Sequence, residues 1–309
     1  STRRRSKDKP SHSDSIAAQV ITVDRGRTLC RIASGQLVSA MKARELGKNS
    51  VVVGDLVNIV GDVSGDTGSL ARIVAVQPRR NSLSRTIDDA GAFEKTIAAN
   101  LDQMIIVAAS ADPSPRQGFI DRCLAVAFDQ GIKPIIVMSK ADLADPDEFL
   151  SAYKDLEVEY LKLKRGDDLT QLHKILEAKV SVLIGHSGVG KSTLVNALLG
   201  IEKRDTGDVN LTTGRGRHTS SSAISFELPN GGWIIDTPGV RSFGLEHIDK
   251  SRVIASFTEF ASVIASCPKN CSHDEATCAL NNYVKASPQA SFRLASLQRL
   301  LDSSSQEII

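Results

Sequence analysis

The residues with the most definite chemistry form the run GHSGVGKS, from Gly185 to Ser192. The run fits the phosphate-loop pattern G-x-x-x-x-G-K-[ST], between an apolar strand-like stretch, VSVLI, and a helix-like one, STLVNALLG. In such a loop the backbone N–H groups face the phosphates, Lys191 adds a positive charge and Ser192 offers a hydroxyl to magnesium. A glycine-rich turn with an exposed lysine is the alternative. The expected nucleotide-binding residues here are Gly185, His186, Ser187, Gly188, Val189, Gly190, Lys191, Ser192 and Thr193.

A second acidic motif, DTPG, runs from Asp236 to Gly239 and ends the apolar run WIID. A carboxylate at the tip of a strand beside a phosphate loop can hold magnesium through water, and the backbone N–H of Gly239 can meet a γ-phosphate. Alone, DTPG is typical of an ordinary β-turn. Together with the phosphate loop it predicts a nucleotide-sensing segment.

A base-reading motif is predicted at residues 139–142, SKAD, which follow the apolar run PIIVM. The Asp142 carboxylate can accept two parallel hydrogen bonds from guanine, a donor pair that adenine lacks. Lys140 would lie along the base. Ser139 stands where GTPases carry Asn or Thr, so we expect a weaker tie between loops. An ordinary helix start with Asp142 near the N-cap is the alternative.

The order of these motifs differs from that of a conventional GTPase, in which the phosphate loop comes first. Here SKAD precedes GHSGVGKS, which precedes DTPG. The sequence therefore predicts a circularly permuted domain, because permutation moves the termini and leaves the site in place. The segment after DTPG runs into the C-terminal region, so nucleotide state should steer that region.

A cluster of three cysteines and one histidine predicts a structural zinc site with no open coordination position. Buried free cysteines are the alternative, but they give no reason for a histidine among them. Cys30 and Cys123 fall in apolar segments and are expected to be buried. The predicted ligands are Cys267, Cys271, His273 and Cys278.

The elements that must position these residues divide the chain into regions. Residues 98–246 alternate apolar β-rich runs with helical stretches, which predicts a mostly parallel α/β sheet. Residues 17–80 contain five short strand-like runs, which favour an all-β oligonucleotide-binding (OB) barrel, with an SH3-like barrel as the alternative. We expect a polar linker at 81–97, phosphate-capable basic side chains in the stretch 78–98, and a helical zinc-binding domain at 247–309.

Composition agrees with a multidomain, soluble protein. The chain has 309 residues, 41% of them hydrophobic and 24% charged, which argues against wholesale disorder. Residues 1–16 are expected to be a disordered basic arm, either a nucleic-acid contact or a solubilising tail. The net charge is +2, and the first ten residues carry +4 of it. The chain has no run of about 20 apolar residues, so no membrane association is expected. We expect a cytoplasmic monomer.

Several motifs resemble those of the ribosome small-subunit-dependent GTPase A family (RsgA). They are the permuted order, GHSGVGKSTLVNALLG, GRGRHTS at 214–220, DTPGVRSFGL at 236–245 and PRRNSLSR after the barrel. The resemblance implies an OB barrel, a permuted GTPase domain and a zinc-binding helical domain. It implies GTP hydrolysis stimulated by the small ribosomal subunit, late in that subunit's maturation. The implied partners are the small subunit with its rRNA, and GTP or GDP.

The same resemblance assigns further roles. Thr219 matches the ligand of magnesium and the γ-phosphate, and His218 is a candidate for placing the attacking water, with phosphate or RNA contact as its alternative. Val240 stands where Ras-like enzymes carry Gln, so slow intrinsic hydrolysis is expected. A third base-contacting loop should fall within 161–169, although its residues do not match. In the predicted zinc-binding motif, the gap between the first two ligands and the gap between the last two are each one residue shorter than in the family.

Two other functions stay open. One is an RNA-binding chaperone or checkpoint in which GTP only holds a conformation. The other is a phosphate-loop ATPase, which would follow if Asp142 were not in the base pocket. Turnover of GTP and ATP with and without small subunits separates these alternatives.

Overall fold

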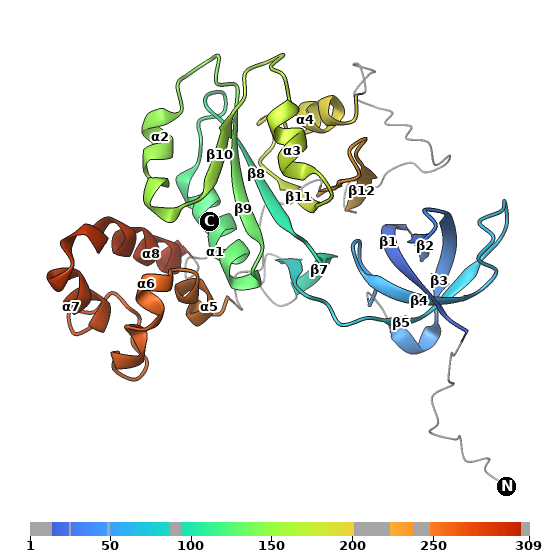
Figure 1. Ribbon diagram of the computed structural model, residues 1–309, viewed down its shortest axis with the longest axis horizontal. Helices are drawn as coiled ribbons and strands as arrows, with labels where there is room; N and C mark the ends of the chain where they lie inside the picture. The colour runs from blue at the N-terminus through green and yellow to red at the C-terminus, as the bar shows by residue number, and fades with distance from the viewer. Residues whose placement is uncertain are drawn as a thin grey trace, which may run out of the picture. The chain divides into compact units, whose positions relative to one another are not determined.

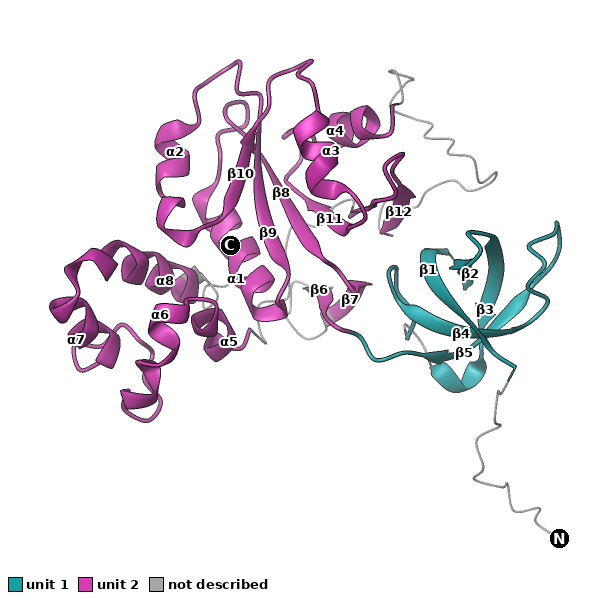
Figure 2. Ribbon diagram, viewed as in Figure 1, with its two compact units in different colours: residues 1–79 teal, residues 80–309 magenta. Residues whose placement is uncertain are grey.

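The computed structural model describes residues 14–24, 26–47, 50–86, 94–200, 223–237 and 248–303 (Figure 1). The chain forms two compact units, residues 1–79 and residues 80–309 (Figure 2). The predicted site residues His218, Thr219 and Gly239 lie outside the described residues, as do the first thirteen residues of the predicted arm.

The first unit is a closed five-stranded barrel, as predicted for an OB-like domain. Its strands are β1 (Ile16–Asp24), β2 (Arg27–Ile32), β3 (Leu37–Lys42), β4 (Leu56–Gly61) and β5 (Ala71–Val76). β1 pairs with both β2 and β4, and β5 pairs with β4 and, in parallel, with β3. A bulge between Val20 and Thr22 interrupts the register of β1 with β2. Alternate residues such as Val20, Val57 and Ile73 fill the interior.

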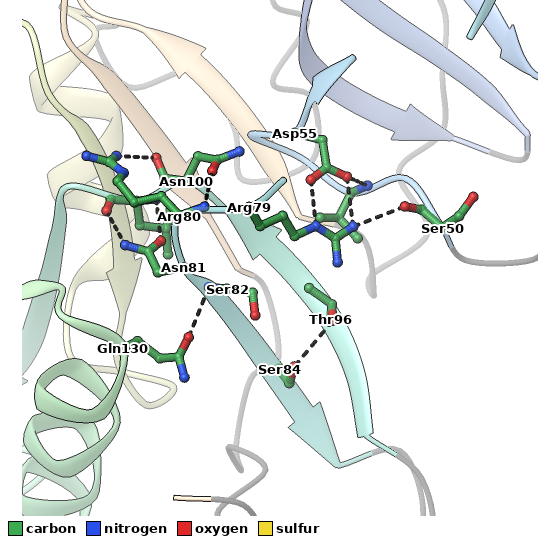
Figure 3. Close-up of polar contacts among 12 residues, drawn as sticks. Ser50, Asp55, Arg79, Arg80, Asn81, Ser82, Ser84, Thr96, Asn100 and Gln130 are labelled. Atoms are coloured by element: carbon green, nitrogen blue, oxygen red, sulfur yellow. Dashed lines mark hydrogen bonds and ion pairs between the residues drawn. The ribbon is translucent and has the colours of Figure 1, made fainter. Parts of the chain in front are cut away.

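The exit from the barrel is fixed by a buried ion pair, shown in Figure 3. Arg79 donates from Nε to Asp55 Oδ1 at 2.7 Å and from Nη2 to Oδ2 at 2.9 Å, and the Asp55 side chain is fully buried. The carboxylate also accepts the Val52 N–H at 2.8 Å. These bonds to Asp55 raise the pKa of Arg79. Arg79 is therefore an internal structural cation rather than a free phosphate ligand.

The next two residues bind within the second unit (Figure 3). Arg80 Nη2 donates to Asn100 O at 3.0 Å and forms an ion pair with Asp102 at 2.9 Å. Asn81 exchanges two hydrogen bonds, both 2.8 Å, with the backbone of Leu101. Sequence analysis expected phosphate-capable side chains after the barrel, but these contacts hold the start of the second unit together.

The segment expected as a polar linker contains two strands, which corrects that prediction. β6 (Ser82–Thr86) and β7 (Glu94–Ala99) form an antiparallel two-stranded sheet. Ser84 and Thr96 face each other across it at 3.4 Å, and Ser82 N donates to Gln130 at 3.1 Å (Figure 3). Their sequences, SLSRT and EKTIAA, contain one and three apolar residues, which is too little regular alternation to reveal a half-buried strand.

The second unit is built on a six-stranded sheet in the order β10-β9-β8-β11-β13-β12. Neighbours from β10 to β13 run parallel, whereas β12 is antiparallel to β13. All seven residues of β8 are buried, as expected for a central parallel strand. The strands are β8 (Gln103–Ala109), β9 (Lys133–Ser139), β10 (Glu159–Lys162), β11 (Val180–Ile184), β12 (Ile224–Glu227) and β13 (Trp233–Asp236).

Helices surround this sheet and continue into the C-terminal part of the same unit (Figure 1). Those between the strands are α1 (Gln117–Gln130), α2 (Asp147–Ser151), α3 (Thr170–Leu176) and α4 (Lys191–Leu198), with the short turn η2 (Lys154–Leu156). The C-terminal ones are α5 (Lys250–Ala255), α6 (Thr258–Ala261), α7 (Ala279–Ala286) and α8 (Ser291–Ser303), with η3 (Ile264–Ser266) and η4 (Pro288–Ala290). None of the helices among the described residues is both long and apolar enough to cross a bilayer.

Candidate nucleotide and metal sites

The phosphate loop lies between β11 and α4, and the structure explains why glycine is required at three of its positions. A Cβ on Gly185 would lie 2.6 Å from the Val107 carbonyl oxygen, too close for any side chain. Gly188 and Gly190 have φ of +83° and +87°, in the left-handed region that glycine adopts without strain. Only this glycine pattern follows the loop's path at low cost, which agrees with the sequence motif.

The strand that carries DTPG lies directly beside this loop. Lys191 Nζ forms an ion pair with Asp236 Oδ1, and it lies 3.4 Å from the carbonyl oxygen of Thr237. Register explains the pairing, because Leu183 of β11 and Asp236 of β13 are direct partners. The Thr237 hydroxyl donates to Leu183 O at 3.1 Å and fixes the strand end. Asp236 and Lys191 therefore meet at the end of the strand.

SKAD also reaches the phosphate loop. Ser139 Oγ lies 2.6 Å from the carbonyl oxygen of Val189 and 3.2 Å from that of Ala108. A hydroxyl has one proton, so the shorter contact is the better placed to receive it. The loop-to-loop tie expected to weaken at Ser139 is thus present as a short hydrogen bond.

The other SKAD residues contact the loops that follow β8 and β10. Lys140, with φ +54°, donates to the Asp112 carbonyl oxygen. Asp142 Oδ1 accepts the backbone N–H of Arg165 at 3.3 Å. The neighbouring α2 begins at Asp147, after an N-cap at Pro146, so the alternative that Asp142 caps a following helix is wrong.

His186 is the phosphate-loop residue with a distinctive packing partner. Its ring lies 4.0 Å, centroid to centroid, from the Phe119 ring at the start of α1. Its Nε2 is buried without a hydrogen-bond partner in the described part of the chain. Burial, with smaller contributions from Arg116 and Arg122, lowers the pKa of His186 and favours the neutral imidazole.

The four predicted metal ligands come together in the loop between η3 and α7. Their ligand atoms all lie within 4.8 Å of one another. The Cys267 and Cys278 sulfurs are 3.8 Å apart, and they lie 3.6 Å and 3.7 Å from His273 Nδ1. Zn–S and Zn–N bonds of about 2.3 and 2.05 Å place tetrahedral S···S and S···N edges near 3.8 and 3.6 Å. The donor set therefore fits one tetrahedral metal ion.

Surrounding contacts support this loop. Cys271 Sγ contacts Glu275 Oε2 at 3.0 Å, and Gln298 donates to the His273 carbonyl oxygen at 2.9 Å. Burial lowers the pKa of His273, which favours the neutral imidazole that a metal requires. Because four ligands complete a tetrahedron, the arrangement suits a structural ion.

Comparison with known proteins decides the family. The family model for the RsgA GTPase matches residues 76–246, which contain the phosphate loop, SKAD and DTPG. The chain belongs to the RsgA GTPase family. It is accordingly a GTP-hydrolysing enzyme.

Two curated relatives, both named small ribosomal subunit biogenesis GTPase RsgA, illustrate the likeness. The protein from Ectopseudomonas mendocina is 40% identical over 242 residues, covering 75% of this chain and 69% of the relative. That from Shewanella oneidensis is 39% identical over 266 residues, covering 82% and 74%.

Solved structures of two proteins share the fold. YjeQ from Thermotoga maritima has a TM-score of 0.67 at 23% identity, covering 95% of this chain and all of the other. YloQ, described as a circularly permuted GTPase, has a TM-score of 0.66 at 19% identity, covering 97% of this chain and all of the other. The permuted fold predicted from motif order is confirmed.

Two residues at the RsgA-family nucleotide site could not be found from the sequence. Phe119 contacts His186 from α1, and the backbone of Arg165 contacts Asp142 from the loop after β10. Neither belongs to a motif, and each is brought in by a chain segment far away in sequence. The sequence indicated only the approximate place of Arg165, which lies in the stretch 161–169 where a third base-contacting loop was predicted.

Proposed function

We propose that this RsgA-family enzyme binds the small ribosomal subunit late in its maturation, hydrolyses GTP there and leaves after hydrolysis. The observation that carries the nucleotide part is convergence. The Ser139–Val189 hydrogen bond and the Lys191–Asp236 ion pair join segments from three regions of the chain. Each of the three motifs, taken alone, could be an ordinary turn or helix start. The three meet at one edge of the sheet.

The proposed roles follow from the groups at that edge. Asp142 and Lys140 select guanine, with Ser139 bracing the base loop against the phosphate loop. Lys191 neutralises the outer phosphates, and the backbone N–H groups of residues 185–190 surround them.

Magnesium, when bound with GTP, would supply positive charge between the β- and γ-phosphates. Ser192 and Thr219 would hold it directly and Asp236 through water. Gly239 would contact the γ-phosphate, and His218 would place the attacking water. Of these, Ser192 and Asp236 lie among the described residues, next to Lys191 in sequence or in space.

The metal proposed for the Cys267, Cys271, His273 and Cys278 cluster is zinc. Three thiolates and one imidazole form a soft donor set that suits zinc and disfavours magnesium or calcium. The tetrahedral edge lengths support one closed, structural ion. Its proposed task is to shape the loop between η3 and α7.

The ribosomal role is supported by the names of the relatives and by the outer face of the barrel. Strand register aligns Arg27, Met41 and Arg72 across β2, β3 and β5, and all three are exposed. No aromatic residue precedes Phe93, so the barrel has no ring on which a base could stack. Contacts to RNA phosphates therefore fit this face better than base stacking, and binding should weaken steeply with salt.

The experiment is GTP and ATP turnover with and without purified small ribosomal subunits. We expect GTP hydrolysis to rise at least about tenfold with subunits, and ATP to be a poor substrate. Unchanged GTP turnover would favour the chaperone function, and equal use of ATP would favour a phosphate-loop ATPase. We expect the active form to be a cytoplasmic monomer.

A further inference from the structure

The first turn of α1 lies between the phosphate loop and α8. Phe119, only 4% exposed, packs its ring on His186 of the phosphate loop. Asp121, 2% exposed, instead forms an ion pair with Arg299 of α8, Nε to Oδ2 2.9 Å. Because each helical residue turns by about 100°, side chains two positions apart point in nearly opposite directions. One helical turn is thus in contact with both the nucleotide site and the C-terminal part.

Arg299 connects more than two elements. Its Nη2 donates to the Ala152 carbonyl oxygen at 3.1 Å, and its guanidinium lies 5.4 Å from the centre of the Tyr153 ring. These residues follow α2, which lies downstream of SKAD. The preceding residue, Gln298, donates to the backbone of the metal ligand His273. A single turn of α8 therefore contacts α1, the end of α2 and the metal loop.

The buried carboxylate depends on this arginine. Asp121 Oδ1 has no hydrogen-bond partner in the described residues, whereas Oδ2 pairs with Arg299. A buried carboxylate without its cation either becomes protonated or moves toward water. Protonation would remove the pairing that holds the start of α1 to α8, and movement toward water would displace this turn together with the ring that packs on His186.

We propose that Arg299 is a positioning residue for the nucleotide site, because its pairing with Asp121 holds the first turn of α1 against His186. The structure of the metal-binding C-terminal part thereby sets the affinity of the phosphate loop for nucleotide. By thermodynamic linkage, nucleotide binding in turn stabilises the docking of α8. The proposal rests on nucleotide binding at the 185–192 loop and is independent of the ribosomal role.

Arg293 provides a matched control on the same helix. It pairs with Glu259, donates to the Asp155 carbonyl oxygen and lies 5.2 Å from the centre of the Phe257 ring. Like Arg299, it is a partly buried arginine that joins α8 to the segment after α2. No hydrogen bond or ion pair joins Arg293 to α1 among the described residues.

The test is titration of the full-length, metal-loaded protein with fluorescent GDP. We expect Asp121→Asn and Arg299→Gln to weaken GDP binding about fivefold or more, the lower end of typical coupling between sites. Arg293→Gln should change it less than about twofold, since it leaves the α1 contact in place. Thermal melts identify the variants that remain folded, and Asp121→Asn preserves side-chain volume.

A double-mutant cycle distinguishes coupling from general loosening. His186 and Arg299 do not touch, so independent effects would add. In the His186→Ala background, Arg299→Gln should cost less than about twofold further affinity. Additive losses, an unchanged affinity in folded Arg299→Gln, or an equal loss in Arg293→Gln would overturn the proposal. Absence of GDP binding by the wild-type protein would instead contradict the proposed nucleotide site.

Discussion

The nucleotide site and the metal site are built in opposite ways. The four proposed metal ligands lie within the twelve residues from Cys267 to Cys278, and their ligand atoms lie within 4.8 Å of one another. The proposed nucleotide site draws on residues 139–142, 185–192 and 236–237, which only strand order and register bring together. A site made within one loop depends on its own ligands, whereas a site made at a sheet edge depends on the whole sheet.

Lys191→Ala is expected to give the largest difference between an effect on GTP hydrolysis and an effect on metal content. Removing the charge that faces the phosphates should reduce GTP hydrolysis by about a hundredfold or more. Steady-state GTP turnover measures this loss, and metal content by mass spectrometry should stay at one ion per chain. Lys174→Ala, which changes an exposed lysine of α3, is the control. Loss of both metal and turnover would contradict the independence of the metal loop.

Cys278→Ser should perturb the metal site with a smaller effect on hydrolysis. Cys278 is buried, and three remaining ligands hold a structural ion poorly. We expect metal content to fall below half an ion per chain, with a lower melting temperature for the C-terminal part. Cys30→Ala, at a buried cysteine of the barrel, should leave metal content unchanged. Full retention of the ion in Cys278→Ser would refute the proposed ligand set.

Ser139→Ala tests how much of the nucleotide site is held by side chains at the sheet edge. Loss of one hydrogen bond to Val189 should destabilise the paired loops by about 1 kcal/mol and weaken GDP binding about fivefold. Ser139→Thr keeps the hydroxyl and should restore most of the affinity. Equal affinities for all three proteins would show that the backbone alone sets the loops.

The smallest effect should appear in the pH dependence of stability. The folded-state pKa of His186 is lowered, so the unfolded chain binds its proton more readily as pH falls below about 6.5. Stability from this group is therefore fully present above that pH and is lost on acidification toward the folded-state pKa. Denaturant unfolding of wild type and His186→Gln between pH 7.5 and 5 should show a shallower decline in the variant, whereas parallel curves would argue against this role.

The contrast between the two sites also explains what sequence could predict. The proposed metal ligands are close in sequence, so their spacing alone indicated the cluster, and the phosphate loop was recognised because its glycines follow a local backbone requirement. β8 and β9 were visible because buried parallel strands are continuous apolar runs.

Features that depend on distant partners were not visible. β6 and β7 have few apolar residues, one and three, and each is recognisable only through the other. Arg79 falls in the stretch expected to offer phosphate-capable side chains, because its partner, Asp55, lies 24 residues earlier in an apolar stretch. Phe119 is one of several apolar residues of α1, and the sequence does not indicate which of them contacts His186 in the folded chain.

The central claim, that three distant segments meet around one guanine nucleotide, is tested most directly by Asp142→Asn with GTP and xanthosine triphosphate. Xanthine carries a carbonyl where guanine carries an amine, so an Asn amide can donate where Asp142 accepts. We predict at least about tenfold weaker binding of GTP and tighter binding of the xanthine nucleotide. Affinities for both nucleotides that match those of wild type would place Asp142 outside the base pocket and contradict the account.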